Sequence, residues 1–219
     1  MRRPDVSEAL RYLGAPHPGP ELRQQAEALA DELAAALQPR YVWAAYPLAR
    51  EGDHFSLQGA GVTLSGATAE RMLDGSEQAV LLACTLGARF DTLLRSAQAR
   101  DMAEAVLLDA LGSAFVEAGC DGAEDEIAAR FPALYRTDRF SPGYGDLPLD
   151  LQPAVCAALN AQRRLGLTVT GSFLLNPAKS VTAVIGLSDA PQPARIRGCG
   201  FCNFRENCQF RKEGTTCGR

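Results

Sequence analysis

The chain has 219 residues, of which 47% are hydrophobic and 22% are charged, as expected for one large globular domain or for one domain with an appendage. Its 22 Lys and Arg residues against 26 Asp and Glu residues give a net charge of −4, which argues against a nucleic-acid partner. No apolar run reaches the roughly 20 residues that cross a bilayer, and no signal-peptide core follows the N-terminus. We therefore expect a cytoplasmic protein without a membrane partner.

The first half of the chain predicts helices and strands in a mixed order. Asp5 is a plausible N-cap with Glu8 three residues later, which predicts a helix over Val6–Tyr12. Between Pro20 and Pro39, apolar residues recur at steps of three and four residues, as on an amphipathic helix. Further strands are expected at 41–48, 55–59, 62–64 and 79–86, and further helices at 67–73, 90–99 and 102–118.

The second half of the chain combines turns, a helix and a strongly β-branched segment. A turn-rich stretch follows Phe131 and Pro132, and the residues at 188–193 have the composition of a linker. A helix is expected at 153–165 and β-like runs at 167–170 and 180–187.

Several common catalytic patterns are missing. The only histidines, His17 and His54, lie in loop-like sequence and offer little to a Ser-His-Asp or Cys-His arrangement. Neither G-x-G-x-x-G nor the P-loop pattern occurs. The usual sequence evidence for a Rossmann or P-loop nucleotide site is therefore absent.

The segment from Arg139 to Asp146 reads R-F-S-P-G-Y-G-D and is a conformationally specified loop. Pro142 fixes its own φ angle, and two glycines permit positive φ angles and a close approach of the backbone to a ligand. The Arg139 guanidinium is suited to a carboxylate, and the Tyr144 ring to a flat ligand. The alternative is a structural turn in which Arg139 pairs with Asp138 or Asp146.

The same loop begins a longer stretch that resembles a known family. After R-F-S-P-G-Y-G-D-L-P come a helix and then L-T-V-T-G-S-F-L-L-N-P-A-K-S-V-T-A-V-I-G. In order and spacing this stretch resembles the S-adenosylmethionine-binding activation domain of cobalamin-dependent methionine synthase. Upstream, L-D-A-L-G-S-A-F-V-E, which ends at Glu117, resembles a helix of that family. The resemblance covers about half of the chain.

The resemblance implies both a fold and a ligand site. The fold would be a C-shaped α+β domain with a twisted, largely antiparallel sheet flanked by helices. Arg139 would hold the carboxylate of S-adenosylmethionine and Glu117 its α-ammonium group. The backbone at Pro142 and Gly143 would line the site, and Tyr144 would lie between the ligand and the corrin ring. In the matching segment, Ser172 and Lys179 are expected to be an ordinary loop serine and a solvated lysine.

The resemblance also implies a reaction and a partner. In that family, cobalamin oxidised to cob(II)alamin is reduced by one electron and remethylated from S-adenosylmethionine. This chain has no D-x-H-x-x-G cobalamin loop and is too short to contain substrate barrels. It would therefore act in trans on a cobalamin-binding methyltransferase or methionine synthase subunit, as a component of a methionine synthase system, with a low-potential electron donor as a possible second partner.

The C-terminal segment has the spacing of a metal site. Cys199, Cys202, Cys208 and Cys217 follow a C-x2-C-x5-C-x8-C pattern, in which a tight turn can aim the first two sulfurs at one ion. Four thiolates suit zinc and iron–sulfur clusters alike, and the need for a low-potential electron favours the cluster. We expect an activation domain over residues 1–190 and a cysteine-rich metal-binding tail over 191–219.

Other interpretations remain open at this point. Cys84, Cys120 and Cys156 lie in apolar or helical sequence and are expected to be small core residues. The first alternative function is a non-catalytic adaptor or chaperone for a corrinoid protein, with tight S-adenosylmethionine binding lost. The second is a metal-sensing or redox-sensing protein in which the tail carries the main function.

Overall fold

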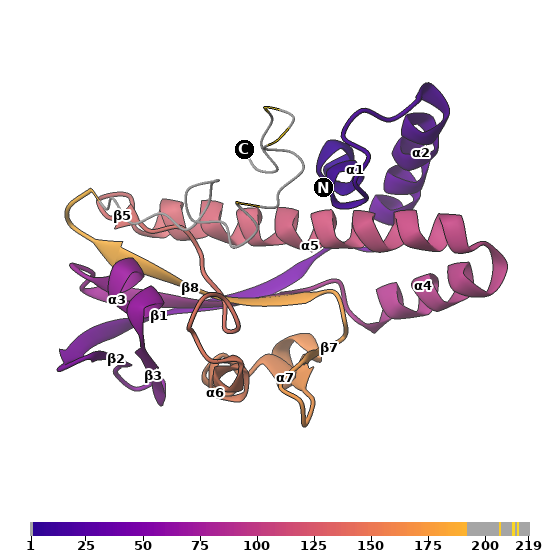
Figure 1. The fold of residues 1–219 in the computed structure, drawn as a ribbon. Coiled ribbons are helices and arrows are strands. Elements are labelled where there is room, and N and C mark those ends of the chain that lie inside the picture. The colour runs from indigo at the N-terminus through magenta and orange to yellow at the C-terminus, as the bar shows by residue number, and fades with distance from the viewer. Residues whose placement is uncertain (1, 192–205, 207–211, 213, 215–219) are drawn as a thin grey trace.

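The computed structural model describes residues 2–191, 206, 212 and 214. Helices and strands alternate irregularly along the chain, as Figure 1 shows. The helices are α1 (Val6–Tyr12), α2 (Pro20–Ala36), α3 (Ala67–Leu73), α4 (Ala88–Arg100), α5 (Met102–Arg130), the 3-10 helix η1 (Leu149–Leu151), α6 (Gln152–Ala158) and α7 (Ala161–Leu165). The strands are β1 (Arg40–Glu51), β2 (His54–Leu57), β3 (Val62–Ser65), β4 (Gln78–Thr85), β5 (Tyr135–Arg136), β6 (Thr168–Val169), β7 (Leu175–Asn176) and β8 (Ser180–Ser188).

A six-stranded sheet forms the centre of the molecule, with the strand order β3-β2-β1-β4-β8-β5. Each neighbouring pair in this sheet is antiparallel. β4 lies in the middle, where Leu82 pairs with Trp43 of β1 and with Ala183 of β8. The short strands β6 and β7 form a separate antiparallel pair.

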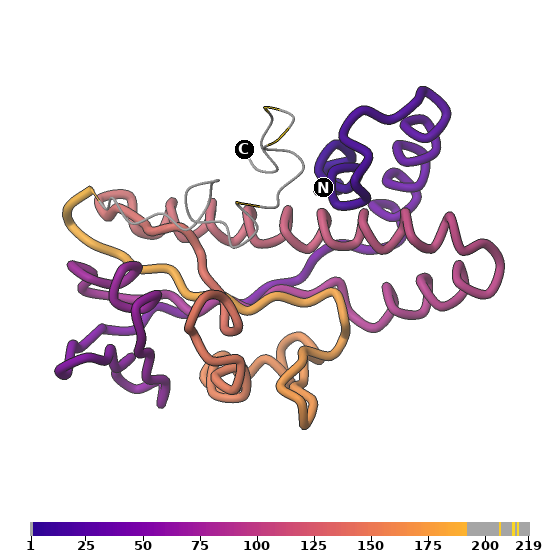
Figure 2. The backbone as a smooth tube through the Cα atoms, in the orientation of Figure 1, coloured from indigo at the N-terminus to yellow at the C-terminus, as the bar shows by residue number. Residues whose placement is uncertain are grey.

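Helices and loops cover the sheet on both faces. Figures 1 and 2 show α5 running along one face with α1, α2 and α4 beside it, while α6 and α7 lie on the other face. Successive side chains of β4 point to opposite faces. Leu82 and Cys84 therefore join the core beneath α5, which we call the α5 core, and Leu81 and Ala83 join the core beneath α6 and α7, the α6 core. Burial on both faces explains why β4 is continuously apolar.

The α+β fold with a largely antiparallel sheet flanked by helices is confirmed. The largest difference from the predicted elements is that α5 continues to Arg130. Glycine disfavours a helix by about 1 kcal/mol, yet it permits close packing. A Cβ atom on Gly119 would lie 2.5 Å from Pro39 Cβ and 2.7 Å from Cys84 Sγ. The glycine therefore allows α5 to approach the sheet rather than ending the helix.

The close packing of α5 predicts a contrast between two of its glycines. We expect Gly112→Ala to lower the free energy of unfolding by about 1 to 3 kcal/mol, because the new methyl group would overlap the buried Phe90 ring. Gly122→Ala is the matched control, since its methyl group meets only the side chain of Arg2, which is 41% exposed. Urea unfolding of both variants tests this; equal stability of the two would contradict the packing account.

The expected helix at 153–165 is divided into α6 and α7. Asn160, the N-cap residue of α7, adopts the left-handed conformation with φ of 52°. Asparagine tolerates this conformation better than most residues, so the chain turns there without a glycine. Within the described part of the chain, no helix combines the length and apolar character needed to cross a membrane.

Candidate functional site

The loop that begins at Arg139 runs along the edge of β8. Phe140 pairs with Val184: the Phe140 N–H donates to the Val184 carbonyl at 3.0 Å, and the Val184 N–H donates to the Phe140 carbonyl at 2.7 Å. Neighbouring side chains of extended backbone point to opposite faces. Phe140 accordingly packs into the α6 core, while Arg139 reaches the carboxylates of α5.

Arg139 lies at the centre of an ion-pair cluster. Its Nη2 atom is 2.5 Å from Glu117 Oε2, its Nη1 atom is 2.7 Å from Asp121 Oδ1, and Nη1 also contacts Glu124. The Arg139 side chain is only 8% exposed. Burial alone would lower the pKa of Arg139, but the nearby carboxylates of Glu117 and Glu124 raise it above its ordinary value. The guanidinium therefore stays charged, and the structure brings Glu117 and Arg139 into direct contact.

The rest of the loop forms a compact turn anchored to α3. The Gly143 N–H donates to the Leu147 carbonyl at 2.8 Å, and Gly143 has a φ of 89°, which favours glycine. Pro142 is buried and Gly143 exposed, while the half-buried Tyr144 packs against the α6 core. The turn thus holds the Tyr144 ring on the α6 side of the sheet, whereas Arg139 contacts α5 on the opposite side.

Asp146 holds this turn against the N-terminus of α3. Its carboxylate accepts hydrogen bonds from the backbone N–H groups of Ala67 at 2.6 Å and Thr68 at 2.9 Å. Hydrogen bonds from Thr68 and Ala67 lower the pKa of Asp146 from 3.8 to about 2. The carboxylate thereby satisfies helix N–H groups that have no partner within α3.

This cap predicts a pH-dependent contribution to stability. Because the pKa of Asp146 is about 2 in the folded protein and about 3.8 when unfolded, its stabilising effect is complete above about pH 4 and is lost towards pH 2. We expect Asp146→Asn to unfold at a lower urea concentration than the wild type at neutral pH, with the difference shrinking as the pH falls from 4 to 2. Asp150→Asn, an exposed change on η1, is the control. A difference independent of pH would contradict the role of the charged cap.

A second, half-buried cation contacts α5 nearer its N-terminus. Lys179, in the loop before β8, places its Nζ atom 2.9 Å from Asp109 Oδ2 and 2.9 Å from Ser113 Oγ. Its side chain is 16% exposed. The expectation of a solvated lysine is therefore wrong, because α5 supplies a carboxylate and a hydroxyl to bind the ammonium group. Ser172 is an exposed loop serine, as expected, whose hydroxyl lies 3.0 Å from that of Thr170.

The two cationic side chains bind one polar strip of α5. Asp109, Ser113, Glu117 and Asp121 follow one another at four-residue steps, which places them on one face of the helix. We call these four residues the α5 strip. Lys179 binds its first two members and Arg139 its last two. The strip is therefore a row of three carboxylates and one hydroxyl along α5, with a cation bound at each end.

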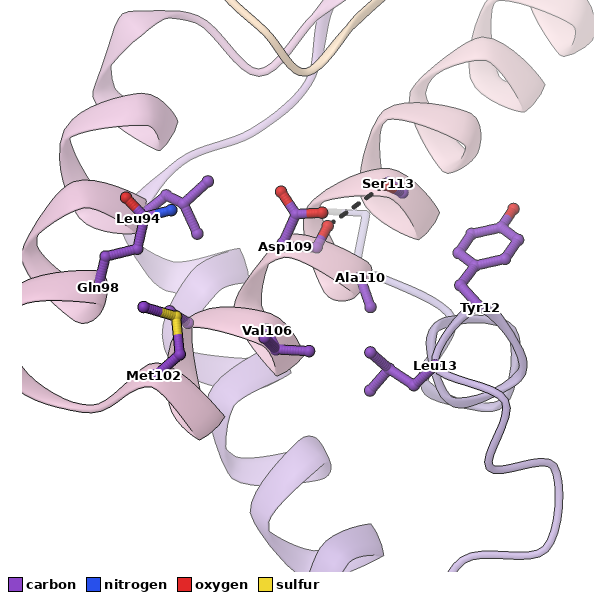
Figure 3. Close-up of a pocket in the computed structure, with 10 residues that line it drawn as sticks. Tyr12, Leu13, Leu94, Gln98, Met102, Val106, Asp109, Ala110 and Ser113 are labelled. Carbon is purple, nitrogen blue, oxygen red and sulfur yellow. Dashed lines mark hydrogen bonds between the residues drawn. The ribbon is translucent and has the colours of Figure 1, made fainter.

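A cavity adjoins the strip where α1, α4 and α5 meet. It has a volume of about 280 Å³, near the lower end for small-ligand sites, and Figure 3 shows Asp109 and Ser113 on its wall. Tyr12 lies on the α1 side, where burial, a hydrogen bond to Glu8 and the charge of Glu117 raise the pKa of the phenol. The cavity wall is formed by Tyr12, Leu13, Leu94, Gln98, Met102, Ala105, Val106, Asp109, Ala110 and Ser113.

The cysteines divide into two groups. Cys84, Cys120 and Cys156 are buried free thiols, as expected for core residues, and burial raises the pKa of Cys156 to about 11. The predicted metal ligands Cys199, Cys202, Cys208 and Cys217 lie outside the described residues. The metal site of the tail stays a prediction.

Sequence reasoning missed most of the α5 strip. Of its four residues, only Glu117 is named from the sequence. The positions between Asp109 and Asp121 are otherwise apolar or glycine, so polar residues at four-residue steps there were a usable signal. The ionic role of Lys179 had a weaker signal, because its partner Asp109 is 70 residues away in the sequence. Tyr12 and Gln98 had none, since only the packing of α1 and α4 on α5 brings them to the cavity.

Comparison with known proteins identifies the fold. No protein-family model matches the chain, and no curated protein matches it. Among solved structures it is similar to the MetH reactivation domain, crystallised with bound AdoHcy, with a TM-score of 0.66 and 18% sequence identity. The match covers 94% of this chain and 77% of that one. This protein therefore has the fold of the MetH reactivation domain.

Proposed function

We propose that this protein binds S-adenosylmethionine along the α5 strip and supports reactivation of a cobalamin-dependent methyltransferase. The amino-acid end of this ligand is a zwitterion, which needs one cation and one anion. Arg139 and Glu117 are such a pair, held 2.5 Å apart on a fold whose structural neighbour was crystallised with AdoHcy. This pairing carries the proposal: the ligand carboxylate binds Arg139, and the ligand ammonium group binds Glu117.

The cavity beside the strip is suited to the other end of the ligand. Its wall is largely apolar and includes Gln98, Asp109 and Ser113 as hydrogen-bonding groups. A flat, uncharged heterocycle with polar edges fits such a lining. Ser113 lies one helical turn, about 6 Å, from Glu117 along α5. We therefore assign the adenosine part to the cavity and the amino-acid part to Glu117 and Arg139.

The turn after Arg139 has a supporting role in the proposal. The resemblance assigns the backbone of Pro142 and Gly143 and the ring of Tyr144 to the ligand site. In the structure the Tyr144 ring packs against the α6 core, on the face of the sheet opposite the α5 strip, so the ligand position proposed here does not use this ring. The Asp146 cap holds this turn on α3, which keeps the loop in one conformation. Holding the methyl group in line with its acceptor supplies most of the catalysis, since the sulfonium already has a good leaving group.

The proposed partner is a cobalamin-binding methyltransferase or methionine synthase subunit that acts in trans. Reactivation consumes one electron for the partner's cob(II)alamin and the methyl group of S-adenosylmethionine, and it leaves S-adenosylhomocysteine. The electron comes from a low-potential donor, and the cysteine-rich tail binds an iron–sulfur cluster or zinc. Within this chain, the residues that act are those that bind and orient the methyl donor.

The experiment that tests this function is a reconstituted reactivation. The full chain, a partner carrying cob(II)alamin, a reductant and methyl-labelled S-adenosylmethionine are combined, and transfer of the label to the partner is measured. We expect transfer only when the chain is present. The experiment is repeated with each cobalamin-binding protein of the same cell. If the label reaches every one of these partners at the same rate with and without the chain, the proposed function is overturned.

One observation favours a second candidate function, that of a corrinoid-protein adaptor. Arg139 contacts three carboxylates of the chain itself, so its charge is satisfied within the chain. A corrinoid-protein adaptor that keeps the fold and does not bind S-adenosylmethionine would need no more than this. The two candidates differ in ligand binding, and calorimetry separates them.

A further inference from the structure

Lys179 is a half-buried lysine that is ion-paired at the wall of the cavity. It is one of two lysines in a chain whose 22 basic residues are otherwise arginines. Its side chain is 16% exposed and bound to Asp109 and Ser113, both of which line the cavity between α1, α4 and α5. A compact cation and its carboxylate are therefore held at the point where the strip meets the cavity.

The position of this ion pair matters for the proposed ligand. With the amino-acid end at Glu117 and Arg139 and the adenosine in the cavity, the ligand sulfur lies between them, beside Ser113. Lys179 Nζ is 2.9 Å from Ser113 Oγ. The sulfur is the one atom whose charge differs between S-adenosylmethionine, a sulfonium cation, and S-adenosylhomocysteine, an uncharged thioether.

We propose that the charge balance of the Lys179–Asp109 ion pair keeps this site from discriminating by charge between the sulfonium ligand and its thioether product. This inference rests on the proposed function and names residues that determine the specificity of the same site. The Lys179 ammonium repels a sulfonium and the Asp109 carboxylate attracts it, so in the intact pair the two effects largely cancel. The thioether feels neither effect at its sulfur.

Replacing one member of the ion pair by an uncharged residue leaves the charge of the other member uncompensated. In Lys179→Met, the Asp109 carboxylate acts alone and attracts the sulfonium. In Asp109→Asn, the Lys179 ammonium acts alone and repels it. For unit charges separated by several ångströms near a protein surface, we expect each change to shift the affinity ratio of the two ligands by about three- to tenfold, in opposite directions. The double variant is expected to return close to the wild-type ratio.

The test is calorimetric titration of the full chain with S-adenosylmethionine and, separately, with S-adenosylhomocysteine. The measured quantity is the ratio of the two dissociation constants in the wild type and in the three variants, at two salt concentrations. Lys179→Arg keeps the charge and is expected to leave the ratio unchanged. Arg50→Met and Asp74→Asn, from an exposed ion pair on β1 and the end of α3, are the matched controls.

The outcomes separate the inference from the function on which it rests. Opposite shifts that shrink at high salt support the inference. Equal changes in affinity for both ligands, or shifts below about twofold in both single variants, overturn it while S-adenosylmethionine binding stands. If the folded wild type binds neither ligand, the proposed function fails and the inference fails with it. A thermal melt confirms that each variant is folded.

Discussion

Replacing Arg139 by glutamine is expected to weaken S-adenosylmethionine binding by about 2 to 5 kcal/mol, a loss of roughly thirtyfold or more. The ligand carboxylate would lose its charged partner in a site where the arginine is only 8% exposed. Glu117, Asp121 and Glu124 would also face one another without their shared cation, so a lower free energy of unfolding is expected as well. Calorimetry at a temperature where the variant is folded measures the binding effect alone.

Two further variants sharpen this test. Arg139→Lys is expected to recover only part of the affinity, because an ammonium group cannot reproduce the planar fork of a guanidinium. Arg95→Gln, on the exposed surface of α4, is the control and should bind like the wild type. Wild-type affinity in folded Arg139→Gln would remove Arg139 from the site.

Deleting residues 195–219 is the second change for which we expect a large effect. The deletion removes all four thiols of the proposed metal site, on which folding of so short a segment would depend because it cannot bury much apolar surface. We expect the shortened chain to bind S-adenosylmethionine normally, because the proposed ligand residues lie upstream. Reductive reactivation of the partner by a physiological donor is expected to fall severely.

The metal itself is checked on the anaerobically purified full chain. Metal analysis and an absorption spectrum should show iron with sulfide, or zinc, and Cys199→Ser with Cys202→Ser should lose it. Cys156→Ala removes a thiol of the α6 core and should retain the metal. Full reactivation by the shortened chain with a physiological donor would show that the tail is dispensable for both electron delivery and docking.

Local patterns were sufficient to predict most of the elements. The N-cap at Asp5 and the apolar stripe after Pro20 correspond to α1 and α2, and the apolar run near Leu82 corresponds to β4. Local patterns were insufficient where tertiary packing determines whether a helix continues or ends. Helix α5 continues through Gly119, where the missing side chain lets the helix pack closely on Pro39 and Cys84. Asn160 separates α6 from α7 because it adopts a left-handed conformation.

The candidate site was predictable only for the residues that a local sequence motif contains. Arg139 and Glu117 were both named from the sequence, and the structure joins them across 22 residues of chain. Their additional partners Asp121 and Glu124 come from the next turns of α5, which the predicted helix ended too early to include. The cavity was not predictable, because it forms only where α1 packs against α5 beside α4, and α1 is separated from these two helices by most of the sheet in the sequence.

The central claim is that the α5 strip binds S-adenosylmethionine, and calorimetric titration of the purified full chain with this ligand tests it most directly. We expect saturable binding of one ligand per chain. The binding should be lost in Glu117→Gln combined with Arg139→Gln, because these changes remove the charged partners of both ends of the ligand zwitterion. The absence of heat change for a folded wild-type chain, across concentrations up to the millimolar range, would contradict the claim and leave the adaptor role as the better account.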